Sequence, residues 1–332
     1  MRFSEFMNEW LYGEDGYYKS FRAIGKKGDF YTAVSTSAFF GASIANYLYK
    51  QIEAKKLPRD ITLVEIGAHQ GYLMGDMIRW LYTKDESLLD SMSFCIVERQ
   101  DMVIEAQKDF FSKNFGDAVE IEYVKDIKKL NLDSAFFVSN EIFDAFACEL
   151  YKDGKIATID STFNIEWVEA SKDIEEFAKK HRLRCGEIAV GYEEFAKDIV
   201  DAAKFFEFVS FDYGEKYVRN DFSIRVYSKH TTYPFFDEEL DIKEHFKKSD
   251  ITYDVNFAHV IESFERAGAK LIDYKTQARA LVEFGIIDIL QEYFNVATKA
   301  QYLSQADKVK TLIAPTVMGD RFKLVHFGNQ NK

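Results

Sequence analysis

The sequence predicts an α/β protein whose central sheet is mostly parallel and covered by helices on both faces. Three observations lead to this class. From residue 61 onward, short apolar segments alternate with amphipathic segments of helical length. A short turn from Gly67 to Gly71 joins the first apolar segment to the first amphipathic one. The chain has 332 residues, of which 47% are hydrophobic and 16% aromatic, enough to fill a large core.

The composition argues against several classes of function. The formal net charge of −12 disfavours broad binding to the phosphates of DNA or RNA, so no nucleic-acid partner is expected. No stretch approaches the ~18 continuous apolar residues of a membrane span. The three cysteines show neither a zinc spacing nor a disulfide pattern, and Cys95 is expected in the core. No metal site is therefore expected, and the predicted location is the cytoplasm.

The first 60 residues are predicted to form a helical extension. Ser4 is a candidate cap for a helix that runs to residue 12, and glycines punctuate the loop that follows. A second helix is expected over 39–56, where apolar residues recur at every fourth position.

The alternation of strands and helices begins at residue 61. Each predicted strand is short and apolar, and each predicted helix has one apolar face. Strands are expected over 61–66, 92–98, 119–124 and 134–139, with helices over 71–82 and 102–115 between them.

The regular alternation lapses after Asp144. Period-two runs around Gly154 predict antiparallel strands over 149–169, so residues 149–204 are predicted to be an inserted subdomain. Residues 61–148 and 205–330 then form the core of the fold. The remaining predicted elements are helices over 174–181, 193–204, 259–267, 277–294 and 299–311 and strands over 205–211, 270–274 and 322–327.

Acidic residues follow five successive predicted strands, at the edge where open parallel sheets bind ligands. The turn after the first strand has the spacing Gly-x-x-x-Gly, and it lacks the Gly-x-Gly-x-x-Gly pattern and the Lys-Ser or Lys-Thr of phosphate sites. Such a turn suits a cationic ligand without phosphate, of which S-adenosylmethionine is the commonest; the alternative is an ordinary tight turn. The acidic residues are Glu65, Glu98, Asp126, Glu141 with Asp144, and Asp212.

Each of these carboxylates has a chemical use. Glu98, after the second strand, suits the paired hydroxyls of a ribose, and Asp126, after the third, suits an exocyclic amine of adenine. For any one residue the alternative is helix capping or a solvated strand end. Gly67 lets the backbone approach a ligand closely.

Asn140 to Asp144 forms a second informative cluster. Two carboxylates three residues apart at a helix start are able to face the same side, and their repulsion is relieved by a cation between them. A guanidinium is such a cation, because its planar fork pairs with carboxylates. The alternative is that Asn140 caps the following helix.

In order along almost the whole chain, these motifs resemble the MidA-type family, which includes a mitochondrial complex I assembly factor that methylates an arginine. The cluster from Asn140 to Ala145 is the most specific part of the resemblance. The chain departs from the family at His69, Ser35 and Ala147. The matching pieces include Gly16-Tyr17-Tyr18, Gly28-Asp29-Phe30, Val64-Glu65-Ile66-Gly67, Val97-Glu98 with Gln107, Asp212-Tyr213-Gly214, Arg225-x-Tyr227 with His230, Asp250-Ile251-Thr252 and Met318-Gly319.

The resemblance implies a class I methyltransferase (Rossmann-like) fold. This fold has a seven-stranded, mostly parallel sheet, an N-terminal helical extension (1–60) that contributes to the active site and an inserted substrate-facing subdomain. It also implies S-adenosylmethionine as cofactor and a protein arginine as substrate, with a respiratory complex I subunit as a candidate. The expected catalytic residues are Glu141, Asp144 and Asp29; those for the cofactor are Glu65, Gly67, Ala68, Gly71, Glu98, Asp126 and Asn140; those for the substrate are Asp212, Tyr227 and His230.

Three hypotheses about function follow. The first is a methyltransferase acting on a protein arginine. The second is a catalytically weak or inactive assembly chaperone that keeps the fold, and His69 in the glycine turn supports it. The third is a nicotinamide oxidoreductase, which the missing Gly-x-Gly-x-x-Gly argues against. The sequence leaves a homodimer open.

Overall fold

A computed structural model describes residues 1–19, 32–228 and 231–329. The chain divides into two compact units. Unit 1 takes its residues from 1–31, 142–194 and 213–260, and unit 2 from 32–141, 195–212 and 261–332. Among the described residues, no helix is both long enough and apolar enough to cross a membrane.

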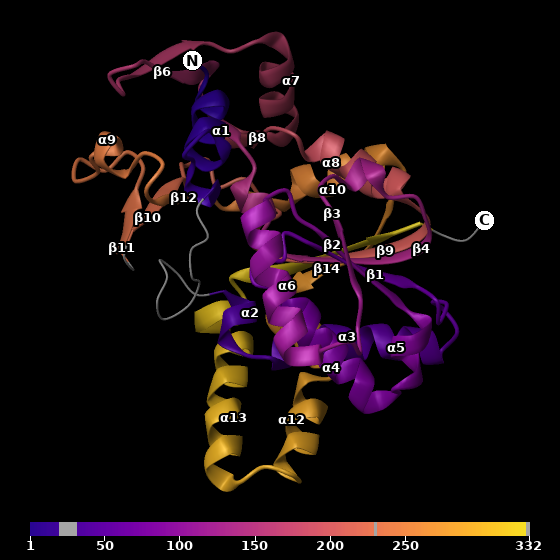
Figure 1. The fold of residues 1–332 in the computed structure, drawn as a ribbon. Helices are drawn as coiled ribbons and strands as arrows, with labels where there is room; N and C mark the ends of the chain where they lie inside the picture. The colour runs from indigo at the N-terminus through magenta and orange to yellow at the C-terminus, as the bar shows by residue number, and fades with distance from the viewer. Residues whose placement is uncertain (20–31, 229–230, 330–332) are drawn as a thin grey trace. The chain divides into compact units, whose positions relative to one another are not determined.

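Unit 2 is built on the predicted mostly parallel sheet. In the part of the chain that the structure describes, its strands lie in the order β14-β15-β9-β4-β1-β2-β3 (Figure 1). Strands β9, β4, β1, β2 and β3 run parallel to one another, and β14 and β15 pair in the antiparallel sense. The strands are β1 (Thr62–Ile66), β2 (Ser93–Val97), β3 (Ile121–Val124), β4 (Leu132–Asn140), β9 (Ala203–Glu215), β14 (Lys270–Thr276) and β15 (Phe322–Gly328).

Aromatic side chains fix the helices to the two faces of this sheet. On one face, Phe208 of β9 stacks on Phe264 and meets Phe195 edge to face. On the other face, Phe211 of β9 contacts Phe40 edge to face. Because residues 208 and 211 differ by an odd number, they point to opposite sides of the strand. Helices α8 (Tyr192–Ala202) and α10 (Phe257–Ala267) therefore cover one face, and α3 (Phe39–Glu53) covers the other.

The helices of unit 2 follow the predicted ones with one correction. The single helix expected over 277–294 is broken into two at Gly285, which has a φ of 97° and is the αL residue that ends the first helix. The other helices are α2 (Ala33–Thr36), α4 (Tyr72–Lys84), α5 (Ser87–Ser91), α6 (Asp101–Phe115), α11 (Gln277–Phe284), α12 (Ile286–Phe294) and α13 (Lys299–Ile313), with short turns at η2 (Ile127–Lys129) and η4 (Pro315–Gly319).

Unit 1 contains two small antiparallel sheets. The predicted strands of 149–169 are confirmed and are joined by a fourth, in the order β7-β6-β5-β8, while β11-β10-β12 form the second sheet. Their bounds are β5 (Cys148–Lys152), β6 (Lys155–Ile159), β7 (Ile165–Glu169), β8 (Cys185–Ala189), β10 (Arg225–Ser228), β11 (Thr231–Pro234) and β12 (Asp250–Thr252). The short β13 (Val255–Asn256) pairs with Gly214 and Glu215, and the helices are α1 (Phe3–Tyr12), α7 (Lys172–His181) and α9 (Ile242–His245), with turns η1 (Tyr17–Lys19) and η3 (Phe143–Ala145).

The first helix packs into unit 1 through aromatic residues. Phe6 stacks on Phe246 and meets Trp10 edge to face. The expected cap was wrong: α1 begins at Phe3 with Arg2 as its N-cap, and the hydroxyl of Ser4 donates a hydrogen bond to buried Glu149. Ser4 therefore bonds to Glu149, which lies 145 residues away in the sequence, instead of capping the helix.

The boundaries of the compact units differ from those of the three predicted regions. Residues 1–19 and 213–260 group with the inserted segment in unit 1. Helix α1 contacts β5, β6 and β12, which accounts for its place in that unit. The functional assignment of the three sequence regions stays a prediction.

Candidate functional site

The register of the parallel strands in unit 2 aligns three of the predicted residues at one edge of the sheet. Ile66 of β1 pairs with Val97 of β2 and with Ser139 of β4. The next residue on each strand is therefore Gly67, Glu98 or Asn140, side by side. Because neighbouring strands lie about 4.8 Å apart, these strand ends form a row about 10 Å long. We call this row the strand-end edge.

The turn that follows β1 has an unusual backbone. Gly67, His69 and Gly71 all have positive φ, of 70°, 46° and 77°. Glycine adopts this conformation freely, and histidine is among the few other residues that tolerate it. Gln107, a buried residue of α6, donates a hydrogen bond from Nε2 to the carbonyl oxygen of His69 at 2.8 Å. His69 therefore keeps the left-handed turn that a glycine would be expected to form there.

Glu65 supports this turn from inside the sheet. Its Oε2 accepts a hydrogen bond from the backbone N–H of Met74, in the first turns of α4, at 2.9 Å. Burial, with a smaller contribution from the negative charge of Asp76, raises the pKa of Glu65 to about 8 against the opposing effect of the Met74 bond. The described contact of Glu65 is with backbone, so the geometry favours a role in positioning the turn.

Glu98 and Asp126 follow β2 and β3. The half-buried Glu98 accepts a hydrogen bond at Oε1 from the N–H of Gln100 at 3.0 Å, and burial raises its pKa. Asp126 is exposed and caps the short turn η2, accepting from the N–H of Lys128 at 3.1 Å. For Asp126 the structure thus shows the capping role that the sequence left as the alternative.

Asn140 and Glu141 lie at the end of β4. Asn140 is the last residue of the strand and does not cap a helix there; its Nδ2 donates to Oε1 of Glu141 at 2.8 Å. Its Oδ1 is buried and has no hydrogen-bond partner among the described residues. Glu141 has a φ of 52° and donates its N–H to the carbonyl of Phe211. Asp212, the residue after Phe211 on β9, is fully buried.

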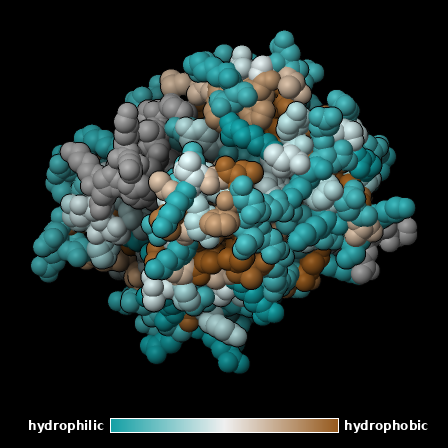
Figure 2. Space-filling model, turned by 90° about the horizontal axis from the view of Figure 1, so that it is seen from below, coloured by the Kyte–Doolittle hydropathy of each residue, from teal (hydrophilic) through white to brown (hydrophobic). Residues whose placement is uncertain are grey.

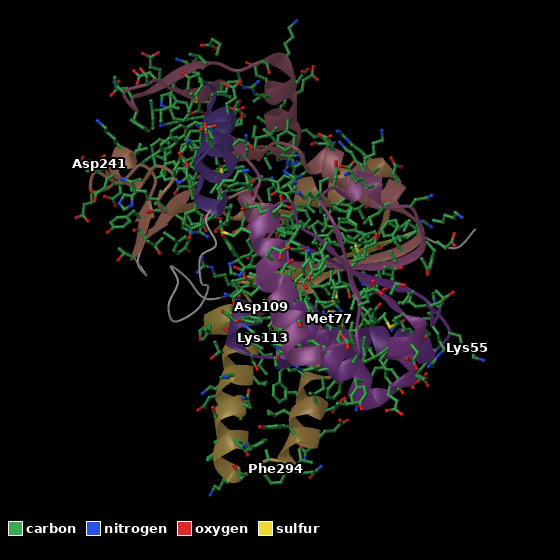
Figure 3. All side chains as sticks on the ribbon, viewed as in Figure 1. Lys55, Met77, Asp109, Lys113, Asp241 and Phe294 are labelled. Atoms are coloured by element: carbon green, nitrogen blue, oxygen red, sulfur yellow. The ribbon has the colours of Figure 1, made fainter. Side chains whose placement is uncertain are left out.

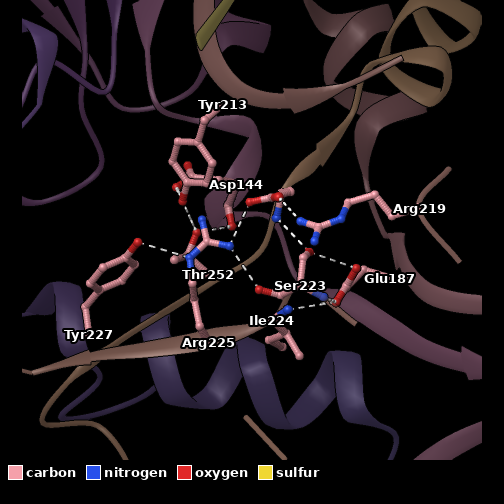
Figure 4. A network of polar contacts seen from close by, with 10 residues as sticks. Asp144, Glu187, Tyr213, Arg219, Ser223, Ile224, Arg225, Tyr227 and Thr252 are labelled. Carbon is pink, nitrogen blue, oxygen red and sulfur yellow. Dashed lines mark hydrogen bonds and ion pairs between the residues drawn. The ribbon is translucent and has the colours of Figure 1, made fainter. Parts of the chain in front are cut away.

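In unit 1, Asp144 is the centre of a buried polar network (Figure 4). Its Oδ2 accepts hydrogen bonds from the hydroxyl of Tyr213 and, at 2.8 Å, from the hydroxyl of Thr252. Its Oδ1 is buried without a hydrogen-bond partner in the described part of the chain. Burial raises the pKa of Asp144, and the positive charge of Arg225 acts in the opposite direction.

Arg225 closes this network from β10. Its guanidinium lies over the ring of Tyr213, 4.9 Å from the centroid, and its Nε donates to the hydroxyl of Tyr227 at 3.0 Å. Its Nη1 pairs with Asp254 at 2.7 Å. Tyr227 was predicted to bind substrate, and in the structure its described partner is this internal arginine. The chain thus supplies its own guanidinium beside the carboxylate of Asp144.

Sequence reasoning placed no role on several residues that matter here. Gln107, Tyr213, Arg225 and Thr252 all belong to the matching motifs, and that resemblance was the signal that could have found them. Asp29 and His230 lie outside the described residues. No cluster of metal ligands is present among the residues that the structure describes.

Fold and strand-end edge together define the class: a class I methyltransferase. A model of the family described as "Putative S-adenosyl-L-methionine-dependent methyltransferase" matches residues 43–275. The chain belongs to this family, and its cofactor is S-adenosylmethionine.

The chain is also similar to curated relatives. It is 25% identical over 286 residues to "Protein arginine methyltransferase NDUFAF7 homolog, mitochondrial" of Caenorhabditis elegans. The alignment covers 74% of this chain and 63% of that protein. It is 25% identical to the Xenopus laevis protein arginine methyltransferase NDUFAF7 over 96% of this chain and 79% of that one. The chain therefore spans less than two thirds of the first of these relatives.

Solved structures confirm the fold. A Burkholderia thailandensis protein with S-adenosyl-homocysteine bound superposes with a TM-score of 0.85 at 22% identity, covering 99% of this chain and 88% of that one. A native structure of a Burkholderia thailandensis protein gives a TM-score of 0.80 at 21% identity, over 99% and 87% of the two chains.

The strand-end edge fits the cofactor of the family. The buried, unpartnered Oδ1 of Asn140 offers an acceptor that no described residue fills. Glu98 offers a half-buried carboxylate to paired hydroxyls, and the left-handed turn from Gly67 to Gly71 brings bare backbone to the same edge. The donor set lacks a lysine or arginine at these positions, as a ligand without phosphate requires.

Proposed function

We propose that this protein methylates an arginine side chain of a protein substrate. The observation that carries the proposal is the end of β4, where Asn140 holds the carboxylate of Glu141 next to the strand-end edge. The names of the relatives support arginine as the acceptor. The resemblance of the motifs supports a complex I subunit as the protein that carries it.

In this proposal the strand-end edge holds the cofactor. Glu98 accepts hydrogen bonds from ribose hydroxyls, Asn140 accepts one from the cofactor's amino group, and the Gly67–Gly71 turn, with Ala68, lies against its methionine part. Asp126 contributes to the adenine pocket. When bound, S-adenosylmethionine supplies a methyl group on a sulfonium that its positive charge already activates. The protein therefore has to align the two reactants and exclude water from them, rather than to activate the methyl group.

The carboxylates act on the substrate. A guanidinium is protonated at neutral pH, so Glu141 pairs with it, orients one nitrogen and accepts the proton that this nitrogen loses as its bond to carbon forms. Asp144 of unit 1 remains a proposed catalytic residue from the sequence, and its Oδ1 has no hydrogen-bond partner among the described residues. Asp212, Tyr227, His230 and Asp29 remain proposed contributors on the substrate side.

Glu141→Gln tests the assignment directly. The amide keeps the size of the side chain but loses the charge, so methyl transfer should fall by more than about 100-fold while cofactor affinity stays within a fewfold. The measurement combines methylarginine counted by mass spectrometry with calorimetric titration of S-adenosylmethionine. The substrate is a protein extract from cells without this protein.

The control is Glu122→Gln, an exposed carboxylate within β3, which should leave both quantities unchanged. Loss of cofactor binding in Glu141→Gln would instead assign Glu141 to the cofactor. Methyl groups found on lysine alone would contradict arginine as the acceptor.

The second candidate function is the inactive assembly chaperone, which His69 in the cofactor turn favours. Tight cofactor binding without any methylated product in the same extract would support this candidate over the enzyme. The cytoplasm remains our proposal for the compartment, on the sequence alone; the relatives are named as mitochondrial.

A further inference from the structure

Unit 2 carries a helical hairpin that takes no part in the strand-end edge. Helices α12 and α13 pack against each other, joined by residues 295–298, and lie side by side in Figure 1. Helix α13 buries Val309 and Leu312 against its neighbours. Phe294, at the end of α12, lies at the far end of the hairpin (Figure 3). The inward side of α13 is therefore accounted for by packing within unit 2.

A different side of α13 presents a regular stripe to solvent. Lys299, Leu303 and Asp307 are all exposed and follow one another at intervals of four residues, which places them on one helix face. Neither Lys299 nor Asp307 makes an ion pair within the described residues. An exposed leucine between two unpaired opposite charges forms what we call the α13 stripe.

Apolar side chains gather near this stripe. Leu303 is 51% exposed, Phe294 is 54% exposed and Val296 in the connecting loop is 83% exposed. Phe294 packs edge to face on Tyr302, with ring centroids 5.0 Å apart, so the tip is ordered by its own aromatic contact. Hydrophobic residues gather on the face seen in Figure 2, which views the molecule from the side of this hairpin. Scattered exposed residues need no explanation, but several on one hairpin indicate a contact surface.

The order of the residues along the α13 stripe indicates which kind of partner it fits. A helix rises 1.5 Å per residue, so Lys299 and Asp307 lie at equal distances of about 6 Å on either side of Leu303. A two-fold axis through Leu303 brings a second copy of α13 alongside in the antiparallel direction. Each Lys299 then meets Asp307 of the other copy, and Leu303 meets its equivalent. An unrelated partner would have no need of this symmetry.

We propose that the protein forms a two-fold symmetric homodimer through the α13 stripe. Such an interface is isologous, since the same patch serves both copies. The charges on the stripe set the direction of pairing, and Leu303 with the hairpin tip supplies the apolar contact. One helix pair lies at the small end of stable interfaces, so the expected dissociation constant is on the order of micromolar. This proposal does not depend on the proposed function.

Analytical ultracentrifugation of the full chain over a concentration series tests the dimer. Leu303→Glu should abolish association, because it puts two carboxylates on the axis. Lys299→Asp should weaken association about tenfold, because it replaces two attractive contacts by two repulsive ones. The double variant Lys299→Asp with Asp307→Lys should restore wild-type association, because the swapped charges still match across the two-fold axis.

The control is Lys308→Asp, which changes the net charge equally but lies off the α13 stripe and should leave the dissociation constant unchanged. Circular dichroism confirms that each variant is folded. A wild-type chain that stays monomeric up to about 100 μM, well above the dissociation constant expected for this interface size, would overturn the proposal. So would a dimer that survives Leu303→Glu, or a double variant that associates no better than Lys299→Asp.

Discussion

At the scale of single residues, two of the strained backbone positions lie at the strand-end edge. His69 and Glu141 both have positive φ without being glycine, at the ends of neighbouring strands β1 and β4. Each costs on the order of 1 kcal/mol relative to an ordinary conformation. Gln107 and Phe211 hold the backbone groups of these two residues through hydrogen bonds. The edge that we assign to the cofactor is thus kept in shape by buried contacts made elsewhere.

Gly71→Ala should destabilise unit 2 by about 2–4 kcal/mol. The φ of 77° penalises any side chain, and an added methyl would lie 2.8 Å from Cε2 of Phe111. Gly268→Ala is the matched control: its φ is also positive, at 100°, but no atom lies within 4 Å of the added methyl. The control should lose only about 1 kcal/mol. Equal losses in urea unfolding would show that contact with Phe111 does not matter.

Glu65→Gln should change how stability depends on pH. The folded-state pKa of about 8 lies above the usual value for a carboxyl, so the folded protein holds an extra proton between these two values. The contribution of the protonated Glu65 carboxyl to stability is complete at low pH and is lost as the pH rises through 8. Between pH 5 and pH 8 the wild type should lose more than about 1 kcal/mol relative to Glu65→Gln. If urea unfolding showed the same change in the free energy of unfolding between pH 5 and pH 8 for both proteins, Glu65 would not be a buried, protonated carboxyl.

The sequence predicted the residues of the strand-end edge better than those of unit 1. Strand ends and turn spacing follow from local patterns, so Gly67, Glu98 and Asn140 were found. Local patterns could not identify the partners of Asp144, because Tyr213 and Thr252 come from segments 69 and 108 residues away. Nor does any local pattern show that Asp144 lies beside an internal arginine.

At the scale of elements, the sequence predicted the alternating part of the chain and missed the short strands. Strands β1 to β4 are apolar runs between amphipathic helices, and their predicted bounds are within a few residues of the observed ones. Strands β10 and β12 have three or four residues and exist because they pair with each other. A strand this short has no period to read, so only the tertiary structure defines it.

Thr298→Ala should loosen the start of α13. The hydroxyl of Thr298 accepts from the N–H of Gln301 in a capping box, and losing such a cap costs about 1 kcal/mol. Amide exchange in the first turn of α13 should become about fivefold faster. Ser171→Ala is the control, since Ser171 precedes α7 without making a capping hydrogen bond. The same acceleration at α7 would show that the cap is not the cause.

At the scale of the whole molecule, the residues assigned to the substrate are divided between the two units, with Glu141 and Asp212 in unit 2. All seven predicted cofactor residues are in unit 2, whereas Asp144 and Tyr227 are in unit 1. The chain enters each unit three times, so neither unit is a continuous stretch of sequence. The predicted boundaries differ because residues 142–148 and 213–260, which the sequence analysis assigned to the core, group with the inserted segment in unit 1.

The most direct test of the account is calorimetric titration with S-adenosylmethionine and S-adenosyl-homocysteine. We compare the wild type with Glu98→Ala and with the control Glu122→Ala. Wild type and control should bind both ligands with micromolar affinity, and Glu98→Ala should bind at least about tenfold more weakly, because it loses a charged acceptor for two hydroxyls. Equal binding by all three proteins, or none by the folded wild type, would contradict the strand-end edge as the cofactor site.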